Sequence, residues 1–155
     1  MHVFLIRHAE AVDETLELRD PSRHLTTHGR AQARSLGDRL RWHDCEPTHV
    51  WTSPLVRAVQ TAELVAAGLG ATVAIEVLPA LAPGESERAV VAALQALPHE
   101  ASVVLVGHEP GMSGLAALLV AAPDFGALDK AEAVRIIDGK LRWRFAWNAE
   151  APAPA

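Results

Sequence analysis

The chain has 155 residues, of which 50% are hydrophobic and 21% are charged, with a formal net charge of −5. This length is near the common size of a single domain, and the composition is ordinary for a globular protein, which excludes a disordered or fibrous chain. Surfaces that bind nucleic acid are usually basic, so the acidic balance argues against a nucleic-acid partner. We expect one domain over residues 1–148.

Two features bear on the cellular location. No apolar run reaches the roughly 18 residues of a membrane-spanning helix, and the first residues show neither a basic leader nor a small-residue cleavage site. The single cysteine, Cys45, cannot form an internal disulfide, as expected in a reducing compartment, and no local motif marks it as a nucleophile. We therefore expect a cytoplasmic protein without a membrane contact.

Strand and helix patterns alternate along most of the chain. Apolar runs typical of buried strands alternate with apolar residues at the 3.6-residue helical period. In chain order these patterns cover residues 3–6 (strand), 31–40 (helix), 48–52 (strand), 55–69 (helix), 72–78 (strand), 87–97 (helix), 103–106 (strand) and 112–121 (helix). The alternation predicts an α/β fold, a three-layer α/β/α sandwich with a mainly parallel sheet.

The last part of the chain predicts a β-hairpin. Residues 134–137 and 141–147 flank Asp138-Gly139, a dipeptide that suits the positive φ angles of a type I′ turn. In the second arm apolar and other residues alternate, which is typical of a strand with one buried face. We expect its aromatic side chains, Trp143, Phe145 and Trp147, in the core. Residues 149–155 are rich in Ala and Pro, and we expect them to be disordered.

Polar residues follow three of the predicted strands. Arg7-His8 follows the first, Ser53-Pro54 the second and Gly107-His108 the one over residues 103–106. In open α/β sheets ligands bind at the carboxyl ends of the strands, so we expect these residues to share one edge. Arg57 lies about one turn into a helix that we expect to begin at Pro54 with Ser53 as its N-cap. The positive end of that helix would favour an anion there.

Two arginines and two histidines at one edge suit a doubly charged tetrahedral anion such as phosphate. The planar guanidinium group offers paired donors that match phosphate oxygens. Clamping the oxygens of a transferring phosphoryl group supplies much of the catalysis of that reaction. One neutral imidazole can act as the nucleophile, and a second, protonated imidazole can donate to the oxyanion. These residue types therefore indicate phosphoryl transfer.

Four segments of the chain, taken together, resemble a known family. They are LIRHAE (5–10), LTTHG (25–29), SPLVRAVQTA (53–62) and GHEP (107–110). In this order they resemble the histidine phosphatase superfamily, also called the phosphoglycerate mutase-like family. The short length, and Arg-His-Ala where the family usually has Arg-His-Gly, are similar to SixA-type phosphohistidine phosphatases. The resemblance implies a phosphoglycerate mutase-like fold and a hydrolase without metal or cofactor.

The resemblance also assigns residues to roles. It implies that His8 is the phosphorylated nucleophile, that Arg7 and Arg57 clamp the phosphate, and that His108 is the second histidine in contact with it. Arg23 matches a position where SixA-like sequences often have arginine. It therefore either reaches the phosphate pocket or is a solvated loop arginine.

The general acid is the role that the sequence determines least. Larger family members draw a carboxylic acid from an inserted segment, for which this chain leaves little room. Glu85 and Glu109 are candidates, with Glu10 behind them. A phosphoramidate needs an acid less, because its leaving imidazole is a far weaker base than an alkoxide. We therefore favour phosphohistidine on proteins as the substrate of a metal-independent phosphatase.

Three alternatives remain open at the level of sequence. The first is a phosphatase or mutase that acts on small phosphate esters, and the second is a phosphate-binding regulatory module that has lost catalysis. The third is a metal site, because His24 and His28 have the i, i+4 spacing of helical zinc ligands. This pair lies in a loop that leads into a predicted helix, which argues against the metal site.

Overall fold

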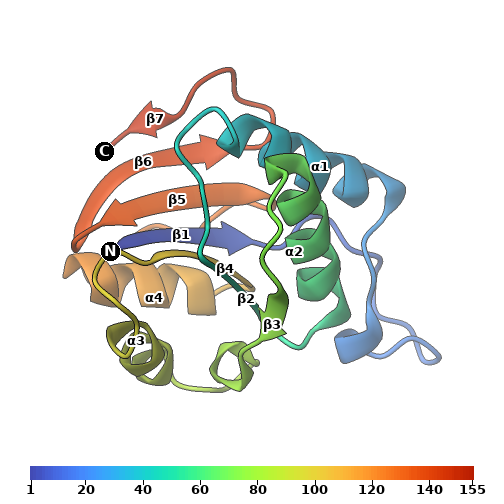
Figure 1. The fold of residues 1–155 in the computed structure, drawn as a ribbon. Coiled ribbons are helices and arrows are strands. Elements are labelled where there is room, and N and C mark those ends of the chain that lie inside the picture. Colours follow the sequence, from blue (N-terminus) through green and yellow to red (C-terminus); the bar gives the residue numbers. More distant parts are fainter.

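The computed structural model describes all 155 residues. The chain forms a seven-stranded sheet with helices on both faces (Figure 1). The strand order is β3-β2-β4-β1-β5-β6-β7. The strands are β1 His2–Arg7, β2 His49–Thr52, β3 Ile75–Val77, β4 Ser102–Gly107, β5 Glu132–Ile137, β6 Lys140–Ala146 and β7 Ala153–Pro154. The helices are α1 Thr27–Leu40, α2 Val56–Leu69, α3 Glu87–Gln95 and α4 Gly111–Val120, with the 3₁₀ helices η1 Asp20–Ser22 and η2 Pro79–Leu81. The predicted three-layer α/β/α architecture is confirmed.

Strands β3, β2, β4 and β1 are parallel to one another, whereas the β1–β5, β5–β6 and β6–β7 pairs are antiparallel. In the parallel part, Arg7 of β1 pairs with Gly107 of β4, and Thr52 of β2 pairs with Val106 of β4. The strands therefore end nearly level with one another. This register brings the residues that follow β1, β2 and β4 to one edge of the sheet.

Alternate residues of each central strand enter two separate cores. Phe4 and Ile6 of β1 pack in the core beneath α1 and α2, whereas Val3 and Leu5 pack in the core beneath α3 and α4. Strand β4 divides its residues in the same way, as expected for a strand with both faces buried. No helix is long and apolar enough to cross a lipid bilayer.

The predicted hairpin forms between β5 and β6. Asp138 and Gly139 have φ angles of 49° and 74°, the positive values that a type I′ turn requires. Trp143 and Phe145 are buried, and the half-buried Trp147 packs against the same core. The structure differs from the sequence-based expectation in residues 149–155, because Ala153–Pro154 form β7 and pair with β6.

The start of α2 also differs from the prediction. The helix begins at Val56, with Leu55 as its N-cap residue, and not at Pro54 with Ser53 as the cap. The amide of Ser53 donates to the carbonyl oxygen of Val106 in β4, so this residue still belongs to the end of the sheet. Pro54 and Leu55 lie between the end of the sheet and the helix, and Arg57 consequently lies in the first turn of α2.

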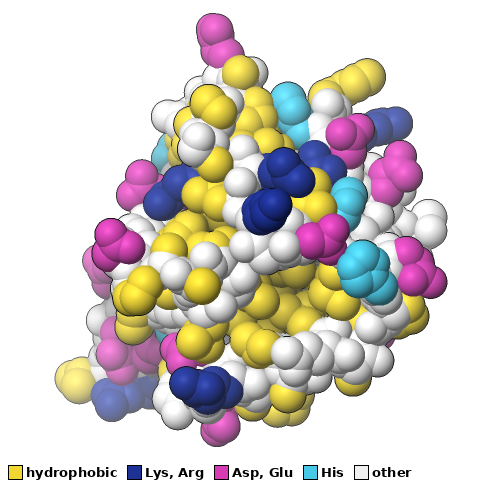
Figure 2. Space-filling view, turned by 90° about the vertical axis from the view of Figure 1, so that its left-hand side faces the viewer, with side chains coloured by type: hydrophobic (Ala, Val, Ile, Leu, Met, Phe, Trp, Pro, Cys, Tyr) yellow, Lys and Arg dark blue, Asp and Glu magenta, His cyan; other side chains and the backbone are white.

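The face at the opposite end of the parallel strands, near the N-terminus, is turned toward the viewer in Figure 2. Hydrophobic side chains surround a hollow on this face, and charged groups stand around it. The ammonium group of Met1 forms an ion pair with Asp138 of the hairpin turn there, at 2.6 Å. The residues that predict phosphate chemistry lie at the other end of the strands.

Candidate active site

The main-chain register sets the positions of the two predicted site histidines. His8 directly follows β1, and its amide donates to the carbonyl oxygen of Gly107 at 2.9 Å. His108 directly follows Gly107 in the adjacent strand β4. The two histidines therefore leave neighbouring parallel strands at the same level, which is the arrangement that the apolar runs predicted.

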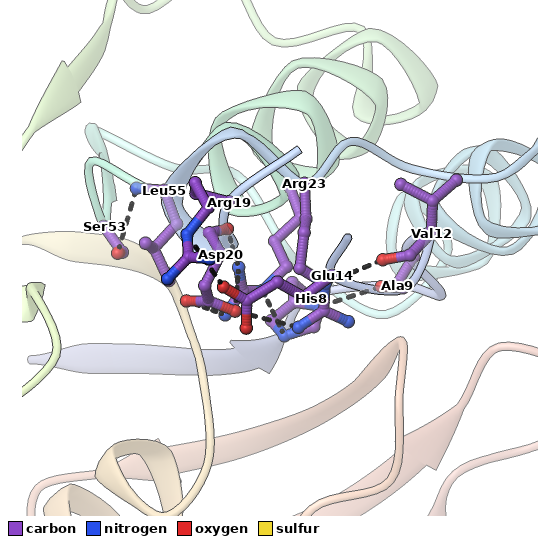
Figure 3. A network of polar contacts seen from close by, with 10 residues as sticks. His8, Ala9, Val12, Glu14, Arg19, Asp20, Arg23, Ser53 and Leu55 are labelled. Atoms are coloured by element: carbon purple, nitrogen blue, oxygen red, sulfur yellow. Dashed lines mark hydrogen bonds and ion pairs between the residues drawn. The ribbon is translucent and has the colours of Figure 1, made fainter. Parts of the chain in front are cut away.

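The ring of His8 is held in one tautomer. Its Nδ1 atom lies 2.8 Å from the carbonyl oxygen of Ala9, and because a carbonyl oxygen can only accept, Nδ1 must carry the proton. The Nε2 atom then keeps its lone pair and accepts a hydrogen bond from Nε of Arg57 at 3.1 Å. Figure 3 shows His8 next to Ala9 within the surrounding network of polar contacts. Two of the predicted site residues are thus in direct contact.

The surroundings of His8 keep its imidazole neutral. The side chain is buried, and its pKa is lowered from 6.5 to about 4, with burial as the largest cause. The hydrogen bond to the carbonyl of Ala9 acts in the opposite direction, and the positive charges of Arg57 and Arg7 contribute to the lowering of the pKa. At neutral pH Nε2 therefore has a free electron pair that could attack an electrophile without prior loss of a proton.

Asp20 holds the guanidinium group of Arg57 from the loop before α1. Nη1 of Arg57 donates to the main-chain oxygen of Asp20 at 2.9 Å, and Nη2 lies 3.4 Å from Oδ2 of its carboxylate. Hydrogen bonding to Arg23, with a further contribution from the charge of Arg57, lowers the pKa of Asp20. The carboxylate is therefore ionised at neutral pH and orients a buried arginine. The sequence did not predict this role, because Asp20 lies in the short 3₁₀ helix η1, which no periodic pattern marks.

Arg23 joins the same network. Its Nη1 atom donates to Oδ1 of Asp20 at 2.9 Å, and its Nε atom donates to the carbonyl oxygen of Val12 at 2.7 Å (Figure 3). Its side chain is only 23% exposed. It therefore lies beside the group that orients Arg57 and is not a solvated loop residue.

The guanidinium group of Arg7 has a partner at only one end. Nη1 donates to the carbonyl oxygen of Leu128 at 2.8 Å, whereas the buried Nε atom has no hydrogen-bond partner. The Leu128 segment is itself held by Glu109, whose Oε1 accepts from the amide of Leu128 at 3.1 Å. The other carboxylate oxygen of Glu109 accepts from the hydroxyl of Ser113 at 2.5 Å. These contacts make Glu109 a support for Arg7.

His108 is half-buried and lies on the wall of a pocket of about 200 Å³. Its buried Nδ1 atom has no hydrogen-bond partner. Burial lowers the pKa of His108 and the charge of Arg57 lowers it further, whereas Asp20, Glu109 and Glu87 act in the opposite direction. Glu85 lines the same pocket and is exposed. Glu87, which the sequence did not indicate, also lines the pocket and is half-buried.

Two other candidate groups lie away from this pocket. Glu10 accepts a hydrogen bond from the hydroxyl of Thr26, the N-cap residue of α1. His24 precedes α1 and His28 lies within it, so the two are not neighbours on one helix, and both are exposed. No group of three or more His, Cys, Asp and Glu side chains is placed to hold a metal ion.

Comparisons with known proteins agree with this geometry. The sequence profile of the histidine phosphatase superfamily (branch 1) matches residues 3–83. The chain is 38% identical over 121 residues to the phosphohistidine phosphatase SixA of Escherichia coli (strain K12), which covers 77% of this chain and 74% of that protein.

Solved structures share the fold. One is that of the protein histidine phosphatase SixA complexed with tungstate, with a TM-score of 0.87 and 31% identity over 95% of this chain and 97% of that one. Another is a mycobacterial glucosyl-3-phosphoglycerate phosphatase, with a TM-score of 0.67 and 22% identity over 86% of this chain and 88% of that one. The second likeness shows the fold alone. By its profile match and its identity to SixA, the chain belongs to the histidine phosphatase superfamily and is a phosphatase.

Proposed function

We propose that this protein is a metal-independent phosphatase that removes the phosphoryl group from phosphohistidine side chains of proteins. In the first of two in-line steps, Nε2 of His8 attacks phosphorus and the substrate histidine departs. In the second step, water hydrolyses the phosphohistidine formed on His8. The observation that carries the proposal is the fixed, neutral tautomer of His8, whose Nε2 lone pair faces Arg57.

The geometry of the site supports the binding of an anion next to His8. The Nε–H group of Arg57 donates to His8, and a phosphoryl oxygen next to His8 would accept the same hydrogen bond. Nε of Arg7 and Nδ1 of His108 are buried without partners, although buried polar groups normally have them. A phosphoryl group bound here could satisfy these nitrogen atoms while Arg7 and Arg57 stabilise its charge.

The similar proteins support the same assignment. The name of the Escherichia coli relative describes a phosphohistidine phosphatase, and the similar solved SixA structure contains tungstate. Tungstate is a tetrahedral oxyanion like phosphate. We transfer the substrate class to this chain because its site combines a buried neutral histidine with two arginines, as the proposed chemistry requires.

The proposal is tested by turnover and by trapping the intermediate. The wild-type protein should hydrolyse a phosphohistidine peptide in the presence of a chelator and form a phosphoenzyme that is labile to acid but stable to alkali. His8→Ala should be inactive and folded. Normal turnover by His8→Ala would refute the covalent mechanism, and a strong preference for sugar phosphates would favour a small-ester phosphatase. Binding of phosphate without turnover of any substrate would favour a regulatory module.

A further inference from the structure

A pocket continues from His108 away from the arginines. It lies between η2, the start of α3 and the start of α4, and its volume is about 200 Å³. Four buried hydrophobic residues form much of its wall, namely Leu81, Val90, Met112 and Leu115. A water molecule occupies about 30 Å³ in the liquid, so a space of this size can hold a five-membered ring. His108 thus separates a phosphate site from an apolar pocket.

The charges on the two sides of His108 are opposite. Arg7, Arg57 and Arg23 lie on the side of His8. Neither lysine nor arginine lines the pocket, and its ionisable side chains besides His108 are Glu85 and Glu87. These charges favour a dianion on the first side and a cation with an apolar body on the second side.

Of the two carboxylates at the pocket, Glu87 is better placed than Glu85 to bind a cation. Its side chain is half-buried and forms no hydrogen bond or ion pair with another side chain, whereas Glu85 is exposed. A Cβ atom added to Gly114 in α4 would lie 3.2 Å from Oε1 of Glu87, so this carboxylate reaches across from α3 to α4. A negative charge in the first turn stabilises α3, but this does not explain why the carboxylate lies at the pocket without a partner.

We propose that this pocket is a subsite for the imidazolium ring of a phosphohistidine substrate, and that Glu87 accepts the hydrogen bond of the ring N–H group. The inference rests on the proposed function and deepens it. Phosphohistidine with a protonated ring combines an anionic phosphoryl group with a cationic, largely apolar ring. The arginines and Glu87 on opposite sides of His108 match these two parts, whereas an alkyl phosphate offers no cation to the pocket.

The subsite would assist departure of the leaving group. When Nε2 of His8 forms its bond to phosphorus, the bond between phosphorus and the substrate nitrogen breaks, and its electron pair stays on that nitrogen. The other ring nitrogen keeps the proton that Glu87 binds, so the leaving group is a neutral imidazole and needs no further proton. The carboxylate favours the protonated ring by charge and hydrogen bonding. An acid at the scissile nitrogen is therefore unnecessary.

Substrate preference tests the subsite. The ratio of kcat/KM for a phosphohistidine peptide to kcat/KM for p-nitrophenyl phosphate should fall about tenfold in Glu87→Gln, because one charge-assisted hydrogen bond to the ring is lost. Glu63→Gln, at an exposed position of α2, is the matched control and should leave the ratio as in the wild type. An unchanged ratio in Glu87→Gln would overturn the proposal.

A binding measurement tests the subsite without turnover. In a titration with imidazole at pH 6, the amide NMR signals of Gly84, Gly111 and Met112 should shift in the wild type and shift less in Glu87→Gln. The absence of a saturable shift, or equal shifts in both proteins, would refute the subsite. A wild-type protein without phosphohistidine turnover would refute the proposed function instead, and the titration would still decide the inference.

Discussion

The pKa of His8 makes a quantitative prediction about stability. In the unfolded chain His8 binds a proton near pH 6.5, whereas in the folded protein it does so only near pH 4. As the pH falls through this window, the unfolded state gains a proton that the folded state does not bind, and the free energy of unfolding decreases. The loss begins near pH 6.5 and is complete below pH 4. At 1.36 kcal/mol per pKa unit it amounts to about 3 kcal/mol.

Substitution of His8 by Gln removes this titration. Urea unfolding of the wild type and of His8→Gln, measured between pH 7 and pH 4.5, should show a steeper loss for the wild type, with most of the roughly 3 kcal/mol lost by pH 4.5. All other ionisable groups are the same in the two proteins, so their contributions cancel in the comparison. If the two free energies of unfolding fall in parallel over this range, the neutral state of His8 in the folded protein is refuted.

Three further substitutions test the surroundings of the site. Asp20→Asn should lower kcat/KM in steady-state assays about tenfold, because Arg57 loses its contact with a charged carboxylate. An increase in kcat/KM would show instead that Asp20 competes with the substrate for Arg57. Glu109→Ala should lower kcat, because the Leu128 segment that accepts a hydrogen bond from Arg7 is no longer held, while the far-UV circular dichroism stays unchanged. An unchanged kcat would refute the idea that Glu109 positions Arg7 through Leu128. Gly29→Ala should destabilise the fold by at least ~2 kcal/mol in urea, since its Cβ would lie 1.9 Å from the oxygen of Glu10; wild-type stability would contradict this clash.

The sheet edge could be predicted from sequence because its determinants are local. The apolar runs that form β1, β2 and β4 each end in polar residues, and parallel strands in register bring such ends together. This reasoning found the fold class and the neighbouring positions of His8 and His108. The roles of these residues came from the resemblance to the family and stay predictions.

The contacts around the site could not be predicted, because polar side chains outside the periodic apolar pattern provide them. Asp20 lies in η1, which no periodic pattern marks. Glu87 begins α3, whose periodicity marks the apolar face of the helix but not the polar side chain that reaches the site. Glu109 directly follows His108, yet its carboxylate contacts Ser113 and the amide of Leu128, which is distant in sequence. Only the tertiary fold determines such partners.

The short strand β7 has a consequence for association between copies of the chain. The last residues run along β6, where the amide of Ala155 donates a hydrogen bond to the carbonyl oxygen of Arg142. The turn before them is held against α1, because Ser35 and Arg39 of this helix donate hydrogen bonds to its main-chain oxygens. Pro154 has no N–H group with which to recruit another strand. The C-terminal segment thus covers polar groups of β6 that would otherwise offer a template for intermolecular pairing, and its removal should make the protein prone to aggregate.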